Sequence, residues 1–266
     1  MGTDSFGSML RRWREGARLT QEQLADDAEV STRHLSCLER GKARPSREMV
    51  LVLASVLELE LRDRNVMLGC AGFAPVYPSS ALDSLAMAPI KKAIDLVLAK
   101  QEPYGAVVVD RTWNLLRIND GAARMLAAFF PVMPEDPRIA GNLLRALLHP
   151  QGLRPCIVNW VEMAAFTLER MDRECSLHPH DEDRKALRAE LLTYPGVAAL
   201  MPDGAPHAND PVATIHLKHG DTEVKLFTML TTLGTPMDVT AQELAIESYF
   251  PADDASERWL RGLPSA

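Results

Sequence analysis

Residues Thr20 to Gly41, TQEQLADDAEVSTRHLSCLERG, predict two short helices separated by a tight break. Thr20 is a hydroxyl residue at the start of the first helix, and Gln23, three positions later, completes a capping box. Ser31 caps the second helix, in which leucines repeat at the spacing of one helical face. Gly41 ends that helix. Because the break is so short, the two helices must cross steeply, and the second one presents a face to solvent.

That face carries hydrogen-bonding side chains, which match the donors and acceptors of base edges in the major groove of DNA. Its members are Thr32, Arg33, His34, Ser36 and Arg40. From Arg33 to Arg47 the chain has five basic residues and one acidic residue, a local charge of +4. Phosphate attraction needs such a cluster, here including Lys42 and Arg44, and does not need a basic protein overall. The alternative interpretation is a solvated helical hairpin with ordinary surface charges.

This stretch resembles the helix-turn-helix of the XRE family of phage-repressor-like regulators, whose pattern is T-Q-x-x-L-A, V-S and S-x-L-E-R-G-x-x-x-P. The matching residues are Thr20, Gln21, Leu24, Ala25, Val30, Ser31, Ser36, Leu38, Glu39, Arg40, Gly41 and Pro45. The resemblance implies that Gln21 holds a phosphate and that the start of the second helix reads bases. It also implies that Glu39 pairs with an arginine of the first helix, which by position is Arg14. Glu29 stands where the family usually has glycine, and a left-handed conformation there costs about 1–2 kcal/mol.

The length of 266 residues and the apolar content of 47% favour two domains. The net charge of −7 is unevenly distributed, because residues 1–69 carry eleven basic and eleven acidic residues, whereas residues 70–266 carry eighteen and twenty-five. A neutral part with one basic edge and an acidic remainder suit a DNA reader fused to a domain that does not touch DNA. Four scattered cysteines and the absence of a secretion pattern or long apolar run predict a cytoplasmic protein without membrane association.

Along the chain, residues 1–69 are expected to form an all-α helix-turn-helix bundle of five helices, the fifth ended by Gly69. Residues 70–81 include AGFAPVYPSS, a composition typical of a linker. Residues 82–266 alternate between helical patterns and strand patterns. The strand patterns lie at 106–110, 113–118, 212–218, 223–233 and 244–250, the first two joined by a turn at Arg111-Thr112. This order predicts an α+β domain with one antiparallel sheet.

The segment HPQGLRPCIVNW places His149, Arg154, Asn159 and Trp160 beside a helix with a thick apolar face. One interpretation is a polar corner that pins two helices. The other is a polar clamp at the mouth of an apolar pocket, because a lipid-like ligand needs hydrophobic walls and a few placed donors. Candidate wall residues are Trp160, Met163, Phe166, Leu226, Phe227 and Met229, and the 12 methionines of the chain suit an adaptable cavity.

The second part of the chain resembles the MmyB-like regulators over most of residues 88–260. The resemblance lies in VVVDRTWNLLRINDGAARML, LLRALLHPQGLRPCIVNWVEMAAFTLER, LLTYPGV and LFTMLTTLGTPMDVTAQELAIESYFPADD. It implies a PAS-like ligand-binding domain behind the XRE reader, with a fatty acid or similar lipid as ligand. Asn119 begins the N-x-x-A sequence that usually follows the second strand in this family.

These observations predict a transcription regulator that binds a double-stranded DNA operator as a homodimer, since one small reader buries too little surface for tight binding. The expected DNA-binding residues are Gln21, Ser31, Thr32, Arg33, His34, Ser36, Arg40, Lys42 and Arg44. The expected ligand-binding residues are Asn119, His149, Arg154, Asn159, Trp160, Met163, Phe166 and Phe227. No metal, cofactor or catalytic activity is expected, because the motifs for them are missing. Two alternatives are a C-terminal domain that serves only dimerisation and a DNA-associated hydrolase using His149 or His178.

Overall fold

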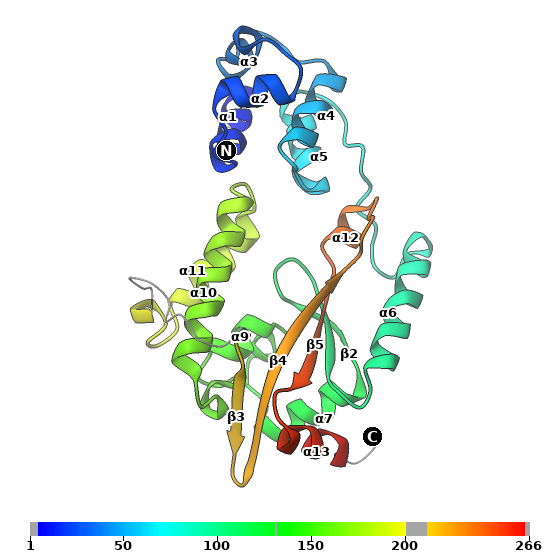
Figure 1. Ribbon diagram of the computed structural model, residues 1–266, viewed down its shortest axis with the longest axis vertical. Helices are drawn as coiled ribbons and strands as arrows, with labels where there is room; N and C mark the ends of the chain where they lie inside the picture. The colour runs from blue at the N-terminus through cyan, green and yellow to red at the C-terminus, as the bar shows by residue number, and fades with distance from the viewer. Residues whose placement is uncertain (1–4, 131, 201–211, 264–266) are drawn as a thin grey trace. The chain divides into compact units, whose positions relative to one another are not determined.

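The structure is a computed structural model that describes residues 5–130, 132–200 and 212–263. The chain divides into two units, whose elements are labelled in Figure 1. The first unit comprises Met1–Ser80 together with Glu174–Glu182 and Thr235–Gln242. The second comprises Ala81–Arg173, Asp183–Gly234 and Glu243–Ala266.

The first unit contains the five helices expected in the first part of the chain. They are α1 (Phe6–Gly16), α2 (Gln21–Asp27), α3 (Thr32–Glu39), α4 (Arg47–Val56) and α5 (Leu61–Cys70). Leu35 and Leu38 of α3 are fully buried, and they share a core with Leu10 and Trp13 of α1. The apolar spacing read from the sequence therefore identifies the buried face of α3.

The predicted helix starts are confirmed. The hydroxyls of Thr20 and Ser31 each accept a hydrogen bond from the backbone N–H three residues later, and Thr20 forms the full capping box with Gln23. Each cap satisfies a helix N–H that has no partner within the helix. Glu29 has a φ of 54°, so the break between α2 and α3 does place a non-glycine residue in the left-handed region.

The end of α5 differs from the prediction. Gly69 remains within the helix, which continues to Cys70, and the chain turns out at Gly72, whose φ is 85°. A glycine permits a left-handed turn without requiring one. The helix therefore ends before Gly72, which adopts that conformation, and not at Gly69, which does not. The following stretch is attached to α5 by Asn65, whose side chain bonds the backbone of Val76 and Tyr77.

The second unit is built on one antiparallel five-stranded sheet in the order β2-β1-β5-β4-β3, which confirms the α+β prediction. The strands are β1 (Ala106–Val109), β2 (Leu115–Ile118), β3 (Ile215–His219), β4 (Thr222–Thr232) and β5 (Ala245–Pro251). The helices are α6 (Ala88–Gln101), α7 (Asp120–Phe129), α8 (Pro137–Ala140), α9 (Leu143–Leu148), α11 (Glu182–Leu192), α13 (Asp254–Gly262) and most of α10 (Trp160–Leu177). The short α12 (Val239–Gln242) belongs to the first unit.

The hairpin of β1 and β2 is present, but its connection is longer than the predicted two-residue turn. The carboxylate of Asp110 accepts hydrogen bonds from the backbone N–H groups of Thr112 and Asn114, which folds the loop around that side chain. Trp113 between them has a φ of 64° and is buried. A single aspartate thus shapes the loop that places an indole ring beside the cavity described below.

Candidate DNA interface and ligand cavity

The residues expected to contact DNA lie on α3 and the segments next to it. Ser31, Thr32 and Arg33 are exposed at its start, whereas His34 and Ser36 are half-buried. The remaining cationic members, Arg40, Lys42 and Arg44, are also exposed. The structure therefore presents the polar side of α3 together with the basic segment that follows it. This is the arrangement that base and phosphate contacts require.

A buried ion pair joins α1 to α3, as the XRE resemblance implies. The guanidinium of Arg14 donates to both carboxylate oxygens of Glu39, at 2.6 and 3.2 Å, and to the backbone oxygen of Leu19 at 2.8 Å. The side chains of Arg14 and Glu39 are only 10% and 3% exposed. Gln21 also donates to Glu39, at 2.6 Å, so its amide nitrogen is already engaged within the protein. The pair fixes the orientation of α3 from its buried side.

Helices α1 and α3 also approach closely at Gly7. A Cβ atom at this position would lie 2.4 Å from the backbone oxygen of Glu39, well inside van der Waals contact. Only glycine permits this approach without a backbone shift. This requirement was missed in the sequence, because Gly7 lies in a helix where glycine has no local signature.

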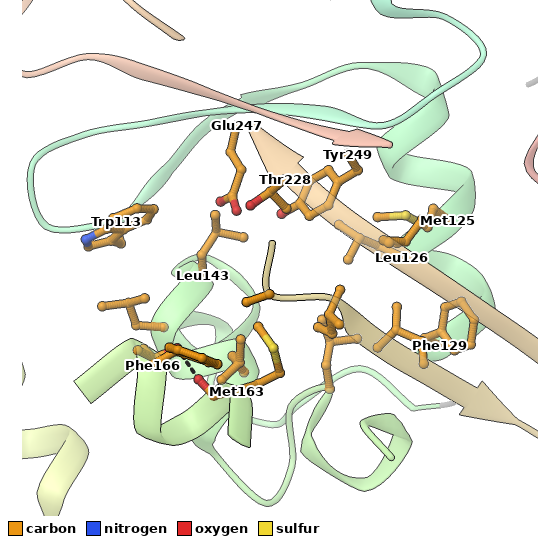
Figure 2. A pocket seen from close by; sticks show the side chains of 18 of the residues that line it. Trp113, Met125, Leu126, Phe129, Leu143, Met163, Phe166, Thr228, Glu247 and Tyr249 are labelled. Carbon is orange, nitrogen blue, oxygen red and sulfur yellow. Dashed lines mark hydrogen bonds between the residues drawn. The ribbon is translucent and has the colours of Figure 1, made fainter. Parts of the chain in front are cut away.

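The second unit contains an apolar cavity of about 190 Å³ between its sheet and helices α7, α9 and α10 (Figure 2). Figure 2 shows Met163 and Phe166 of α10 facing it from one side and Thr228, Glu247 and Tyr249 from the sheet. Most of the lining is carbon. Its members are Trp113, Met125, Leu126, Phe129, Leu143, Leu144, Leu147, Leu153, Met163, Phe166, Thr167, Arg170, Ala213, Ile215, Leu217, Leu226, Thr228, Glu247 and Tyr249.

The sheet side of the cavity carries its main polar groups. Burial raises the pKa of Glu247, while a hydrogen bond with Thr228 and the positive charge of Arg170 oppose that change. Burial, together with the nearby charge of Glu247, raises the pKa of Tyr249 well above its ordinary value, so its phenol stays protonated. The guanidinium of Arg170 stacks on the indole of Trp113, 4.0 Å from the ring centroid.

Two of the predicted ligand-binding residues, Met163 and Phe166, line the cavity. Phe227 does not, because successive side chains of a strand point to opposite faces, and its neighbours Leu226 and Thr228 occupy the cavity face. Its ring instead stacks on Phe250 of β5, with the ring centroids 5.4 Å apart. The strand period could have excluded Phe227 once Leu226 was taken as a wall residue.

The segment from His149 to Trp160 forms a polar corner, the first of the two interpretations offered by its sequence. The indole of Trp160 donates to the backbone oxygen of Leu147 at 3.1 Å. The guanidinium of Arg154 lies 3.6 Å above that indole ring and donates to the backbone oxygen of Pro195. Arg154 and Trp160 line a separate surface cleft together with three prolines, and neither of the two lines the apolar cavity.

The other polar members of this segment also bond the protein itself. Asn159 donates to the backbone oxygen of Thr214 at 2.8 Å and accepts the N–H of His216 at 3.0 Å, which joins the start of α10 to β3. The Nδ1 atom of His149 accepts the N–H of Gln151, and its ring packs edge-on against Tyr194. The structure therefore places both residues in scaffold positions, away from the cavity lining.

Asn119 is likewise buried among backbone groups. Its carbonyl oxygen accepts the N–H of Ala106 at 2.8 Å and of Ala122 at 2.9 Å. Its amide nitrogen donates to the backbone oxygens of Leu98 and Tyr104, at 3.3 and 2.9 Å. The side chain caps α7 and ties that helix to α6 and β1. It is a structural residue of the second unit.

Sequence reasoning missed seven cavity residues with polar or aromatic groups, namely Trp113, Phe129, Thr167, Arg170, Thr228, Glu247 and Tyr249. One signal was available, since a glutamate in the otherwise apolar and small run of β5 is unusual for a buried strand. Within the described ranges, no helix is long and apolar enough to cross a bilayer. Nor do three potential metal-binding side chains gather in the part of the chain that the structure describes.

Residues 90–263, more than half of the chain, match the family described as the MmyB-like transcription regulator ligand binding domain. The chain belongs to this family. Residues 5–66 of this MmyB-like regulator match a helix-turn-helix domain family. The protein is thus a DNA-binding transcription regulator that carries a ligand-binding domain.

Comparison of this regulator with curated proteins finds no match. Among solved structures, it is similar to the one titled "Structure of an RNA-binding Light-Oxygen-Voltage Receptor", at 13% identity and a TM-score of 0.24. The alignment covers 96% of the regulator and 60% of the receptor chain, so the regulator spans less than two thirds of that receptor.

Proposed function

We propose that this regulator changes its occupancy of operator DNA when a fatty acid or related lipid enters the cavity of its ligand-binding domain. The apolar cavity is the observation that carries the proposal. A switch of this kind requires the ligand to bind with different affinity in the DNA-bound and free arrangements. The DNA is read by a homodimer on a two-fold site, because a single helix-turn-helix buries too little surface.

In this proposal the start of α3 reads bases and the basic segment after it holds phosphates. Ser31, Thr32, Arg33, His34 and Ser36 address base edges in the major groove. Arg40, Lys42 and Arg44 contact the phosphate backbone. Gln21 does so through the second N–H of its amide nitrogen, since the first is donated to Glu39. The exposure of Arg33 and Lys42 supports these roles, since neither side chain is packed into the helical core.

Replacing Arg33 by alanine is expected to lower the preference for operator over scrambled duplex by about tenfold, since a base contact contributes roughly 1–3 kcal/mol. Replacing Lys42 by alanine is expected to weaken both duplexes alike and to reduce the slope of log affinity against log salt by about one. Fluorescence anisotropy on an operator obtained by in vitro selection measures both quantities. The exposed Lys92 of α6, changed to alanine, is the control. Equal loss of specificity in R33A and K42A would contradict the assigned roles.

The cavity has the size and lining that an apolar ligand requires. Apolar cavities of about 150 Å³ bind a benzene-sized molecule, and the volume here is about 190 Å³. Its walls are leucine, methionine and phenylalanine side chains from the helices, with polar groups concentrated on the sheet side. Ligand sites in proteins typically combine such walls with a few polar groups.

Replacing Met163 by tryptophan is expected to fill the cavity and reduce the fraction of protein carrying an apolar ligand by about tenfold or more, because overpacking leaves no room for it. Native mass spectrometry of protein purified without added lipid measures that fraction. Val161→Trp is the matched control, since Val161 is on the same helix but 58% exposed. If the fraction of M163W protein carrying a ligand equals that of the wild type, the ligand binds outside this cavity. Ligand-free wild-type protein would instead favour a domain that serves only dimerisation.

A further inference from the structure

Among the residues that the structure describes, Arg170 is the one cation of the cavity lining. It lies on α10, seven residues after Met163 and four after Phe166, so all three belong to one face of the helix. Its side chain is half-buried. The helix face that supplies part of the apolar wall therefore also brings a guanidinium group to the cavity.

The indole ring of Trp113 holds this guanidinium by stacking. The guanidinium carbon of Arg170 lies 4.0 Å from the ring centroid of Trp113, which is buried and also lines the cavity. The N–H groups of arginine lie in the plane of the guanidinium, so a stacked arginine still donates hydrogen bonds from its edge. Arginine has five such donors, and bonds to the protein and to a ligand are therefore compatible.

The sheet contributes further hydrogen-bond donors to the same cavity. Thr228 of β4 is the cross-strand partner of Tyr249 of β5, and Figure 2 shows both side chains pointing to one space. Each carries a hydroxyl group, which can donate to an acceptor. Burial raises the pKa of Glu247, which favours its neutral carboxyl, a group that also donates.

This lining discriminates between the possible polar ends of an amphiphile. A carboxylate accepts hydrogen bonds and donates none, so it matches a guanidinium and two hydroxyl groups. A ligand ammonium would instead meet the positive charge of Arg170. An alcohol would lack the attraction between opposite charges, which is strong in an apolar surrounding.

We infer that Arg170 binds the carboxylate of an anionic amphiphile, with the hydroxyls of Thr228 and Tyr249 as further donors, and that the apolar walls enclose its chain. This inference rests on the proposed ligand-binding function and deepens it. It selects the ionised fatty acids among the related lipids, and it names the side chain that recognises them. Specificity for the anion then comes from one guanidinium at the edge of an apolar cavity.

Isothermal titration calorimetry of the full chain at neutral pH tests the inference with octanoate, n-octanol and octylammonium. These probes share one chain length and differ in the charge of the polar end. Wild-type protein is expected to bind octanoate at least about tenfold more tightly than either of the other two, because only octanoate is attracted by the charge of Arg170. Since this comparison needs no variant, it stands even where a substitution impairs folding.

Arg170→Gln removes the charge and keeps a hydrogen-bond donor. It is expected to lower the affinity for octanoate by about tenfold or more and to change that for n-octanol less than about threefold, because only the bond between ions is lost. Arg170→Lys keeps the charge and is expected to retain the preference for octanoate over n-octanol. Arg173→Gln is the matched control, since Arg173 is on the same helix but exposed and outside the cavity lining. All three affinities are expected to be unchanged in that variant.

Wild-type protein that binds n-octanol or octylammonium as tightly as octanoate would overturn the inference. So would an R170Q variant that loses affinity for octanoate and n-octanol by the same factor, since Arg170 would then only support the cavity wall. In either case, weaker binding of n-octanol by M163W than by the wild type would leave the ligand-binding function standing. Binding of none of the three probes by the wild-type protein would reject the proposed ligand class together with the inference.

Discussion

Glu39→Gln is expected to destabilise the helix-turn-helix by about 3 kcal/mol, the lower end of the cost of removing one partner from a buried ion pair. The substitution leaves the guanidinium of Arg14, whose side chain is 10% exposed, facing a neutral amide. It also disturbs the hydrogen bond from Gln21, which is made to the same carboxylate. The pair joins α1 to α3. Its loss therefore weakens the contact that orients α3, the helix proposed to read bases.

Amide hydrogen exchange measures this loss within the first unit alone. A cost of that size corresponds to a roughly hundredfold faster exchange of protected amides in α1 and α3. Glu22→Gln is the matched control, because Glu22 is an exposed acid on α2 of the same bundle. Exposed charges contribute little, so exchange in the control should match the wild-type protein. Equal exchange in E39Q and wild type would show that the buried pair does not stabilise the bundle.

Asn119→Ala is expected to lower the free energy of unfolding of the ligand-binding unit by about 4 kcal/mol, since several buried backbone groups lose their partners at once. Two N–H groups and two carbonyl oxygens bond this side chain, and alanine can replace none of these bonds. A lost helix cap alone accounts for only about 1 kcal/mol. The larger part of the effect comes from the ties to β1 and to the end of α6.

Urea denaturation followed by tryptophan fluorescence reports on this unit, because Trp113, Trp160 and Trp259 lie in it and only Trp13 lies in the other. Asp253→Ala is the control, since Asp253 caps α13 through a single hydrogen bond to the N–H of Ser256. Its cost is expected to be about 1 kcal/mol. Similar midpoints for the two variants would mean that Asn119 acts as a helix cap and nothing more.

The helix-turn-helix was predictable from the sequence because its determinants are local. A hydroxyl cap acts on an N–H three residues away, and an apolar spacing reports on one turn of helix. The starts of α2 and α3 and the burial of Leu35 and Leu38 follow from such signals. The pairing of Arg14 with Glu39 needed the XRE resemblance, since 25 residues separate the two. The close approach at Gly7 had no local signal.

The ligand-binding unit was predictable only in part. Strand patterns and the MmyB-like resemblance indicated one antiparallel sheet, and Met163 and Phe166 were placed among the wall residues. The segment containing Arg154 and Trp160 was compatible with a clamp or with a corner, because polar and aromatic groups serve in both. Their partners are backbone oxygens at Pro195 and Leu147, which no spacing in the sequence identifies.

The sequence by itself determined the order of helices and strands, the polar face of α3 and the family. Only the tertiary structure decided which strand face meets α7, α9 and α10, and therefore that Glu247 and Tyr249 border the cavity while Phe227 does not. The physical reason is that a two-residue period defines two faces of a strand without saying which one is covered. That choice is made by segments distant in the chain, through the packing of their side chains.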